Sequence, residues 1–270
     1  MDYLSIYKMC FDKVNELGIN FDFNNNTHLQ HPKNMDDIYK NFVYHSQNRS
    51  RGCAINFFKE EENKNYELLT EVWECICKFK FDFNNDFSYI QLFEKLRKIT
   101  KVKEKLSLEK GKDIQYLELA KTCQCIKKYL REYQDINAFI NGHKFTDDWR
   151  KNWKILKNVS NSIYNVSTEL VPDFFKEQDC IEGRGFLIKA DIHVKRFIST
   201  LFNNGNELSD QKVYYYIMKM YKDCNDTKKT QYEPYKLDKL IYLIGEHCSD
   251  PKESIKFAKN VKNQCLNENG

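Results

Sequence analysis

The sequence predicts an all-α protein, a multi-helix bundle of about nine or ten helices. Only nine glycines and four prolines interrupt 270 residues, fewer turn residues than all-β folds and doubly wound sheets usually need. Apolar residues recur at helical spacing along nearly the whole chain, and polar capping residues precede several of these stretches. No segment has a convincing strand pattern, so the separate signals agree on one fold class.

Apolar stripes predict five helices in the first half of the chain. The first helix is expected to end at Gly18, because glycine commonly follows the last helical residue. A long fourth helix follows Asn84-Asn85-Asp86, and the third and fifth helices each carry a Cys-x-Cys pair. The five predicted helices cover residues 4–17, 35–43, 68–79, 92–106 and 114–133.

Start and stop signals predict the helices of the second half. Thr146 is an expected N-cap followed by two acidic residues, and Ser209 is a second N-cap. Pro234 and Pro251 suit the first helical position, and Gly205 lies just beyond a predicted helix end. The predicted helices cover residues 149–163, 187–202, 209–221 and 234–244, and a last one starts at residue 250.

A break at Asn141-Gly142 predicts a boundary between two helical lobes. The first lobe covers 1–140 and holds both Cys-x-Cys pairs, and the second covers 141–270; one continuous domain is the alternative. Phe21-Asp22-Phe23-Asn24-Asn25 recurs as Phe81-Asp82-Phe83-Asn84-Asn85, an echo that favours an internal duplication. The echo and the cysteine pairs have different offsets, so they define no single period.

Ten cysteines, an even number, form the most informative motif. Two Cys-x-Cys pairs, Cys75-Ile76-Cys77 and Cys123-Gln124-Cys125, lie in predicted helices. Residues two apart on an α-helix point in nearly opposite directions, so each thiol is expected to tether its helix to a different neighbour. We therefore expect a disulfide-stapled bundle. The disulfide candidates are Cys10, Cys53, Cys75, Cys77, Cys123, Cys125, Cys180, Cys224, Cys248 and Cys265.

Two other interpretations of the cysteines stay open, buried free thiols in a cytosolic protein and a zinc site. Structural zinc favours Cys-x2-Cys spacing, which the chain lacks, and only His247 adjoins a cysteine. We expect no metal and no cofactor.

Disulfides imply an oxidising compartment, and five Asn-x-Ser/Thr triplets agree with secretion. These triplets begin at Asn25, Asn48, Asn158, Asn165 and Asn225. The start Met1-Asp2-Tyr3 lacks the basic segment and apolar run of a signal peptide. We therefore expect a secreted protein in its mature form, with the signal peptide removed. No apolar stretch has the length that a membrane span needs.

The sequence contains no recognisable catalytic constellation. It lacks a Gly-rich phosphate loop, Gly-x-Ser-x-Gly and His-Glu-x-x-His. We interpret Gly183-Arg184-Gly185 as a turn, His28 and His31 as surface residues, and Cys180 as a disulfide partner rather than a nucleophile. The 17 tyrosines and 19 phenylalanines are interpreted as an aromatic core. We predict that the chain is not an enzyme and has no catalytic residues.

One basic segment, residues 95–112, resembles a nucleic-acid-binding or membrane-surface helix in charge alone. The net charge of the whole chain is only +4, with acids and bases otherwise interspersed, so a solvated helix face is the preferred interpretation and nucleic acid is an unlikely partner. Its basic residues are Lys95, Arg97, Lys98, Lys101, Lys103, Lys105, Lys110 and Lys112.

The two Cys-x-Cys pairs, on helices some tens of residues apart, resemble the bicycle family of secreted aphid effectors, named for two Cys-Tyr-Cys motifs. Ile76 and Gln124 stand where that family has tyrosine, and the motifs cover few residues of the chain. The resemblance implies delivery in saliva into plant tissue, including galls. There the protein would bind a host protein or other macromolecule and alter host development or defence. The family implies no catalytic residues.

Two other classes of protein stay open. Helical variant surface antigens of malaria-type parasites are also rich in Asn and Lys and bear cysteines, so the chain is alternatively the ectodomain of such an antigen. A helical enzyme without a recognisable motif is the third class. A membrane anchor in the gene would identify the antigen, and a deep pocket with perturbed titratable groups would identify the enzyme.

Overall fold

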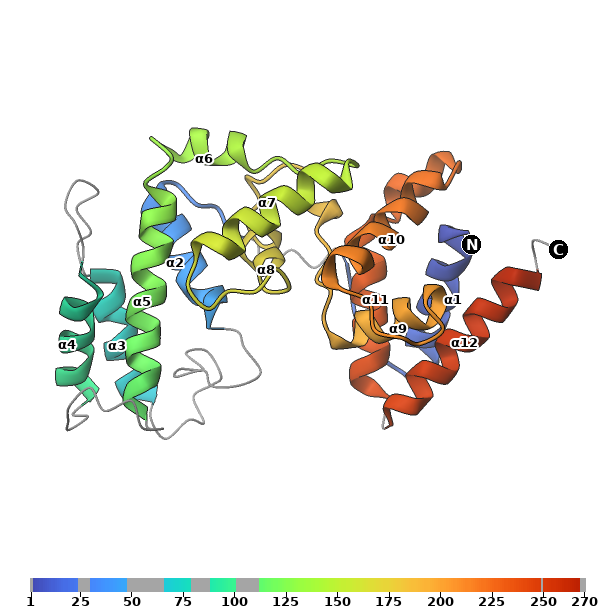
Figure 1. Cartoon of the computed structure of the whole chain (residues 1–270), viewed down its shortest axis with the longest axis horizontal. Coiled ribbons are helices and arrows are strands. Elements are labelled where there is room, and N and C mark those ends of the chain that lie inside the picture. Colours follow the sequence, from blue (N-terminus) through green and yellow to red (C-terminus); the bar gives the residue numbers. More distant parts are fainter. Residues whose placement is uncertain are drawn as a thin grey trace. The chain divides into compact units, whose positions relative to one another are not determined.

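The computed structural model describes residues 2–23, 30–47, 66–78, 88–100, 112–248 and 250–267. Within these residues the chain forms twelve α-helices and two 3-10 helices (Figure 1), and the one β-contact is an isolated bridge between Gln30 and Gln178. The predicted all-α fold class is confirmed. The second copy of the echo, 81–85, lies outside the described residues, as does the predicted helical segment 101–106.

The chain divides into two compact units that interleave along the sequence. The N-terminal helix contacts helices near the C-terminus, so it belongs with them rather than with the residues that follow it. This division differs from the two lobes that the break at residue 141 indicated. Unit 1 comprises Met1–His31, His143–Lys157 and Val171–Gly270, and unit 2 comprises Pro32–Gly142 and Asn158–Leu170.

Unit 1 is organised around α11, which contacts both α1 and α9, and α9 in turn contacts α12. Several helices begin at the expected kind of cap, since the side chains of Asp2, Asp191 and Ser209 accept backbone N–H groups of a first turn. The unit contains α1 (Tyr3–Glu16), the start of α7 (Trp149–Ser162), α8 (Val171–Lys176), η1 (Arg184–Phe186), α9 (Ile192–Phe202), α10 (Asp210–Asp223), η2 (Thr227–Gln231), α11 (Pro234–His247) and α12 (Pro251–Asn267).

Two predicted helix starts in unit 1 were wrong. The helix expected from residue 187 begins at Ile192, because residues 187–190 are not helical and Asp191 caps α9. The cap expected at Thr146 lies at Asp148, whose carboxylate accepts the N–H of Arg150 at 3.0 Å. The hydroxyl oxygen of Thr146 instead accepts the N–H of Asp148 at 3.2 Å, in the turn that precedes α7.

Unit 2 is built on α5, which lies beside α4 and α2 (Figure 1), while α3 packs on α4. Its interior holds a cluster of aromatic rings, here called the ring cluster, in which Phe42 lies 6.3 Å from Tyr129 and 5.8 Å from Phe139 between ring centroids. All three are almost completely buried. The unit contains α2 (Met35–Ser46), α3 (Tyr66–Lys78), α4 (Tyr89–Thr100), α5 (Lys112–Leu130), α6 (Ile136–Gly142) and the end of α7.

Candidate functional site

The disulfide staples predicted from the sequence find no support in the structure. All nine cysteines in the described part of the chain are free thiols, and Cys53 lies outside that part. Cys10, Cys123, Cys224 and Cys265 are buried, as expected of cysteine used as a small apolar core residue. Free thiols are the alternative that the sequence left open, and the fold packs without a covalent link between these residues.

The two thiols of the second Cys-x-Cys pair differ in burial, whereas both thiols of the first pair are half-buried. On α5, Cys123 is buried and Cys125 is half-buried. Burial raises the pKa of the Cys123 thiol to about 12 and that of Cys77 to about 11. Burial is also the main cause of the raised pKa of Cys180. A protonated thiol is a poor nucleophile, so the raised pKa values disfavour these three cysteines as nucleophiles.

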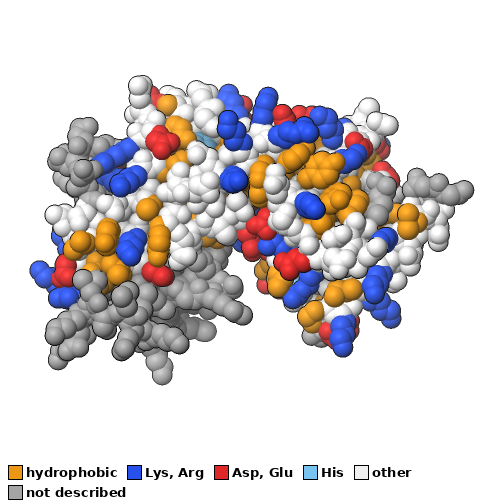
Figure 2. Space-filling view, viewed as in Figure 1, with side chains coloured by type: hydrophobic (Ala, Val, Ile, Leu, Met, Phe, Trp, Pro, Cys, Tyr) orange, Lys and Arg blue, Asp and Glu red, His pale blue; other side chains and the backbone are white. Residues whose placement is uncertain are grey.

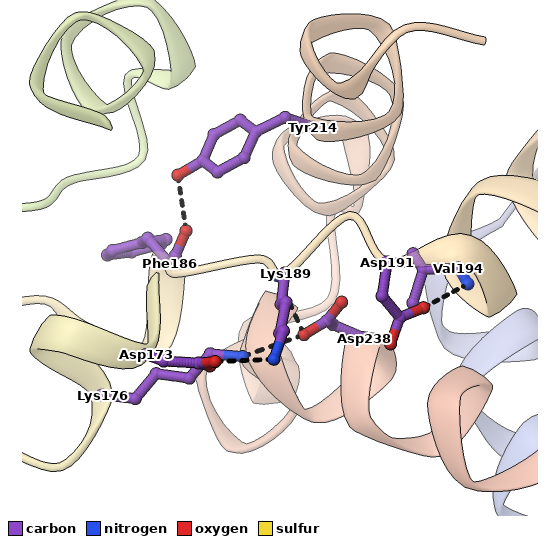
Figure 3. A network of polar contacts seen from close by, with 8 residues as sticks. All are labelled: Asp173, Lys176, Phe186, Lys189, Asp191, Val194, Tyr214 and Asp238. Carbon is purple, nitrogen blue, oxygen red and sulfur yellow. Dashed lines mark hydrogen bonds and ion pairs between the residues drawn. The ribbon is translucent and has the colours of Figure 1, made fainter. Parts of the chain in front are cut away.

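A network of charged side chains lies inside unit 1 (Figure 3). The carboxylate oxygen Oδ2 of Asp238 on α11 accepts from Lys176 Nζ and from the backbone N–H of Lys189, both at 3.1 Å. Lys189 Nζ in turn lies 2.6 Å from Asp173 Oδ2. Asp238 is almost completely buried, and burial raises its pKa to about 6 although Lys176 opposes the shift. The residues are distant in sequence, and no local motif indicated them.

This charged network holds an extended segment in place. Lys189 lies in the non-helical stretch between η1 and α9, and its backbone and side chain are bonded to α11 and α8 respectively. At the end of the stretch, Asp191 accepts the N–H groups of His193 and Val194 at 2.9 Å. Carboxyl groups with raised pKa values occur in active sites and also in structural networks. Here each bond of Asp238 is to a group that fixes the chain, which favours the structural role.

A row of four partly exposed aromatic rings, here called the ring row, crosses α7, α10 and the end of α9. Trp149 and Tyr215 lie 5.1 Å apart between ring centroids, and Tyr215 lies 5.3 Å from Tyr216. Tyr216 stacks on Phe202 at 4.4 Å, with the two planes 7° from parallel. All four side chains are half-buried rather than core residues. Figure 2 shows hydrophobic side chains gathered over α10, with Lys and Arg side chains around them.

A basic stripe runs along α7 beside the ring row. Arg150, Lys154 and Lys157, here called the α7 stripe, follow the i, i+4, i+7 spacing of one helix face and are exposed. The sequence of α7 contains no Asp or Glu. Trp149 and Trp153 occupy the neighbouring face at i, i+4 spacing, and the Arg150 guanidinium lies 5.1 Å from the Trp149 ring centre. Aromatic and basic residues therefore adjoin on one surface of unit 1.

Sequence reasoning missed this surface. It interpreted the aromatic residues as core and looked for a basic helix in residues 95–112, of which 101–111 lie outside the described residues. In the described part of that segment, Arg97 pairs with Glu94 at 3.4 Å. The alternation of aromatic and basic residues from Trp149 to Lys157 was the signal that could have indicated the surface.

Gly183 and His31, which were also considered from the sequence, both make contacts within the fold. Gly183 has φ +75°, and a Cβ there would lie 1.9 Å from the carbonyl oxygen of Phe145, so this turn requires glycine. His31 contacts the carboxylate of Asp179 through Nδ1 at the surface, while His28 lies outside the described residues.

Comparisons of the chain with protein-family models, with curated proteins and with solved structures find no match. No helix in the described ranges is long and apolar enough to span a membrane. The same ranges contain no group of three or more His, Cys, Asp or Glu side chains placed to hold a metal ion.

Proposed function

We propose that the protein is a secreted effector that binds a macromolecule of a host plant and thereby alters host development or defence, without catalysis. The ring row is the observation that carries this proposal. Trp and Tyr are enriched at the centres of protein interfaces, where they supply large contact areas at a low cost in side-chain entropy. In unit 1 they lie half-buried against one another, with part of their apolar area left for a partner to cover.

The surroundings of the ring row also favour a preformed binding surface. Tyr214, next to Tyr215 on α10, is buried and donates its hydroxyl hydrogen to the carbonyl oxygen of Phe186 at 2.6 Å (Figure 3). Trp153 lies 5.9 Å from the same Tyr214 ring. These contacts fix the helices that carry the row, and a surface that is rigid before binding loses less conformational entropy on association.

The assignment to a plant host rests on the resemblance of the two Cys-x-Cys pairs to the bicycle family. We propose that the protein is secreted on the basis of the same resemblance. The proposal does not depend on disulfide staples, because the ring row lies on helices held by packing and hydrogen bonds.

The proposal is tested with a saturable binding measurement on extracts of plant tissue. The wild-type chain is compared with Tyr216→Ala, which removes a ring of the row, and with Phe257→Ala, which removes a half-buried ring of α12 outside it. We expect the first change to weaken binding by about tenfold or more and the second to leave it within about twofold. Expression in plant tissue should alter growth or defence markers for the wild type and Phe257→Ala, but not for Tyr216→Ala.

Equal effects of the two substitutions, or binding that does not saturate, would contradict the proposal. Turnover of a substrate by the wild-type chain, abolished in Asp238→Asn, would replace it with the enzyme class.

A further inference from the structure

We propose that the ring row and the α7 stripe together dock an acidic, partly apolar segment of another protein. This inference rests on the proposed function and specifies the chemistry of the partner. Lys151, Lys154 and Lys157 have no ion pair with any other described residue, and neither has Lys212 on α10. A surface with several uncompensated cations is electrostatically complementary to an anionic partner.

Two lysines of the neighbouring helices have acidic partners, unlike the lysines of α7. Lys219 of α10 pairs with Asp223, and Lys195 of α9 pairs with Asp210 at 2.6 Å. No such acid follows the lysines of α7, whose sequence has four basic residues and no acidic one. The missing carboxylates are therefore expected on the partner.

The spacing of the surface indicates the pattern that the partner must present. Arg150 and Lys157 are seven residues apart, so the α7 stripe spans about 10 Å along the helix. The ring row adjoins this stripe through Trp149, so apolar and basic groups lie side by side. A segment with carboxylates along one edge and apolar side chains along the other matches both features.

The arrangement of the rings favours a protein over single-stranded nucleic acid. Bases bind such surfaces by stacking on free ring faces. Here Tyr216 and Phe202 stack on each other, and Arg150 lies over Trp149. Each of these contacts occupies one face of a ring, which leaves fewer faces on which bases could stack. Carboxylate and apolar side chains require no free ring face, because they contact cations and ring edges.

The chain supplies its own control, a second basic stripe with the same spacing. Lys252, Lys256 and Lys259 of α12 follow i, i+4, i+7 and are exposed, with Glu253 in the same first turn. Reversing three charges there changes the net charge of the protein as much as reversing the α7 stripe. The two triple variants therefore separate a local docking site from general attraction of a basic protein for an acidic molecule.

The experiment uses the full chain and fluorescence anisotropy. The probes are a labelled peptide of alternating Glu-Glu and Leu-Leu pairs and a labelled oligouridylate of equal length. The proteins are the wild type, the α7 variant Arg150→Glu/Lys154→Glu/Lys157→Glu, the α12 variant Lys252→Glu/Lys256→Glu/Lys259→Glu, and Tyr216→Ala, each checked for helix content and melting temperature.

We expect saturable binding of the peptide, weakened about tenfold or more in the α7 variant and in Tyr216→Ala, and changed by no more than about twofold in the α12 variant. Equal weakening in both triple variants, or a failure to bind the peptide, would overturn the inference. Tighter binding of oligouridylate than of the peptide would assign the surface to nucleic acid. If the peptide fails while plant-tissue binding still depends on Tyr216, the partner class is wrong and the proposed function stands.

Discussion

The ring cluster of unit 2 and the ring row of unit 1 both consist of packed aromatic side chains, but the two differ in burial. In the ring cluster, Phe42 and Phe139 are 0% exposed and Tyr129 is 1% exposed. In the ring row, by contrast, Trp149 and Tyr216 keep part of their surface exposed. The rings of the ring row are even closer together, at 4.4–5.3 Å between centroids against 5.8–6.3 Å in the ring cluster, so close ring packing alone does not mark a core. The difference in burial therefore decides whether a ring contributes mainly to the free energy of unfolding or keeps apolar area for a partner.

The largest expected effect is a difference in alkylation rate between two cysteines of α5 in unit 2. Cys123 is buried, whereas Cys125 on the same helix is half-buried. We expect iodoacetamide to modify Cys125 at least about a thousandfold faster than Cys123, because Cys123 reacts only through rare opening of the fold. Peptide mapping by mass spectrometry measures both rates. Similar rates would show that this interior is open to solvent.

Intact mass before and after reduction tests the free thiols directly. A protein produced in an oxidising compartment whose mass rises on reduction contains disulfides. That result would support the disulfide bonds predicted from the sequence.

Truncating a ring of the ring cluster should cost far more stability than truncating a ring of the ring row. Phe139→Ala is expected to lower the free energy of unfolding by about 3–5 kcal/mol, because it leaves a cavity among fully buried rings. Phe202→Ala removes a half-buried ring and should cost only about 1–2 kcal/mol. Urea denaturation monitored by circular dichroism gives both values. Equal losses would mean that the ring row is part of the core.

Among the described residues, unit 1 has buried carboxyl groups and unit 2 has none, and the buried Asp238 predicts a pH dependence. The pKa of Asp238 is raised to about 6, above its unfolded value of 3.8, so the folded state binds more protons between these pH values. Stability from this group is therefore present at low pH and is lost as pH rises from about 4 to about 6, by about 2–3 kcal/mol.

The control for this prediction is Asp238→Asn, which keeps the shape of the side chain and does not titrate. The difference in unfolding free energy between wild type and variant should change with pH in that window and stay level above about pH 7. A difference that is independent of pH would show that Asp238 does not titrate in this range.

The smallest effect on stability is expected at the α7 stripe. Lys154→Ala removes an exposed charge without an ion pair among the described residues, so the free energy of unfolding should change by less than about 0.5 kcal/mol. Thermal unfolding at matched ionic strength measures the change. A large loss would show that the stripe serves folding rather than docking.

Local patterns in the sequence determined the helices of this protein. Stripes of apolar residues predicted most of them, but not the short helices α6 and α8. Ser209 was correctly assigned as a cap, and Gly18 adopts φ +68° just after α1, as expected at a helix end. These features depend on residues within one or two turns of each other, which is why the sequence alone reveals them.

Only the tertiary structure decided which residues are covered and which remain exposed. Nothing near Phe139 or Tyr216 in the sequence distinguishes a core ring from a surface ring, because burial depends on helices distant in the chain. The same holds for Asp238, whose partners Lys176 and Lys189 come from other segments. Helical periodicity is a local property of the backbone, whereas burial, pKa shifts and a shared surface arise only when distant segments pack together.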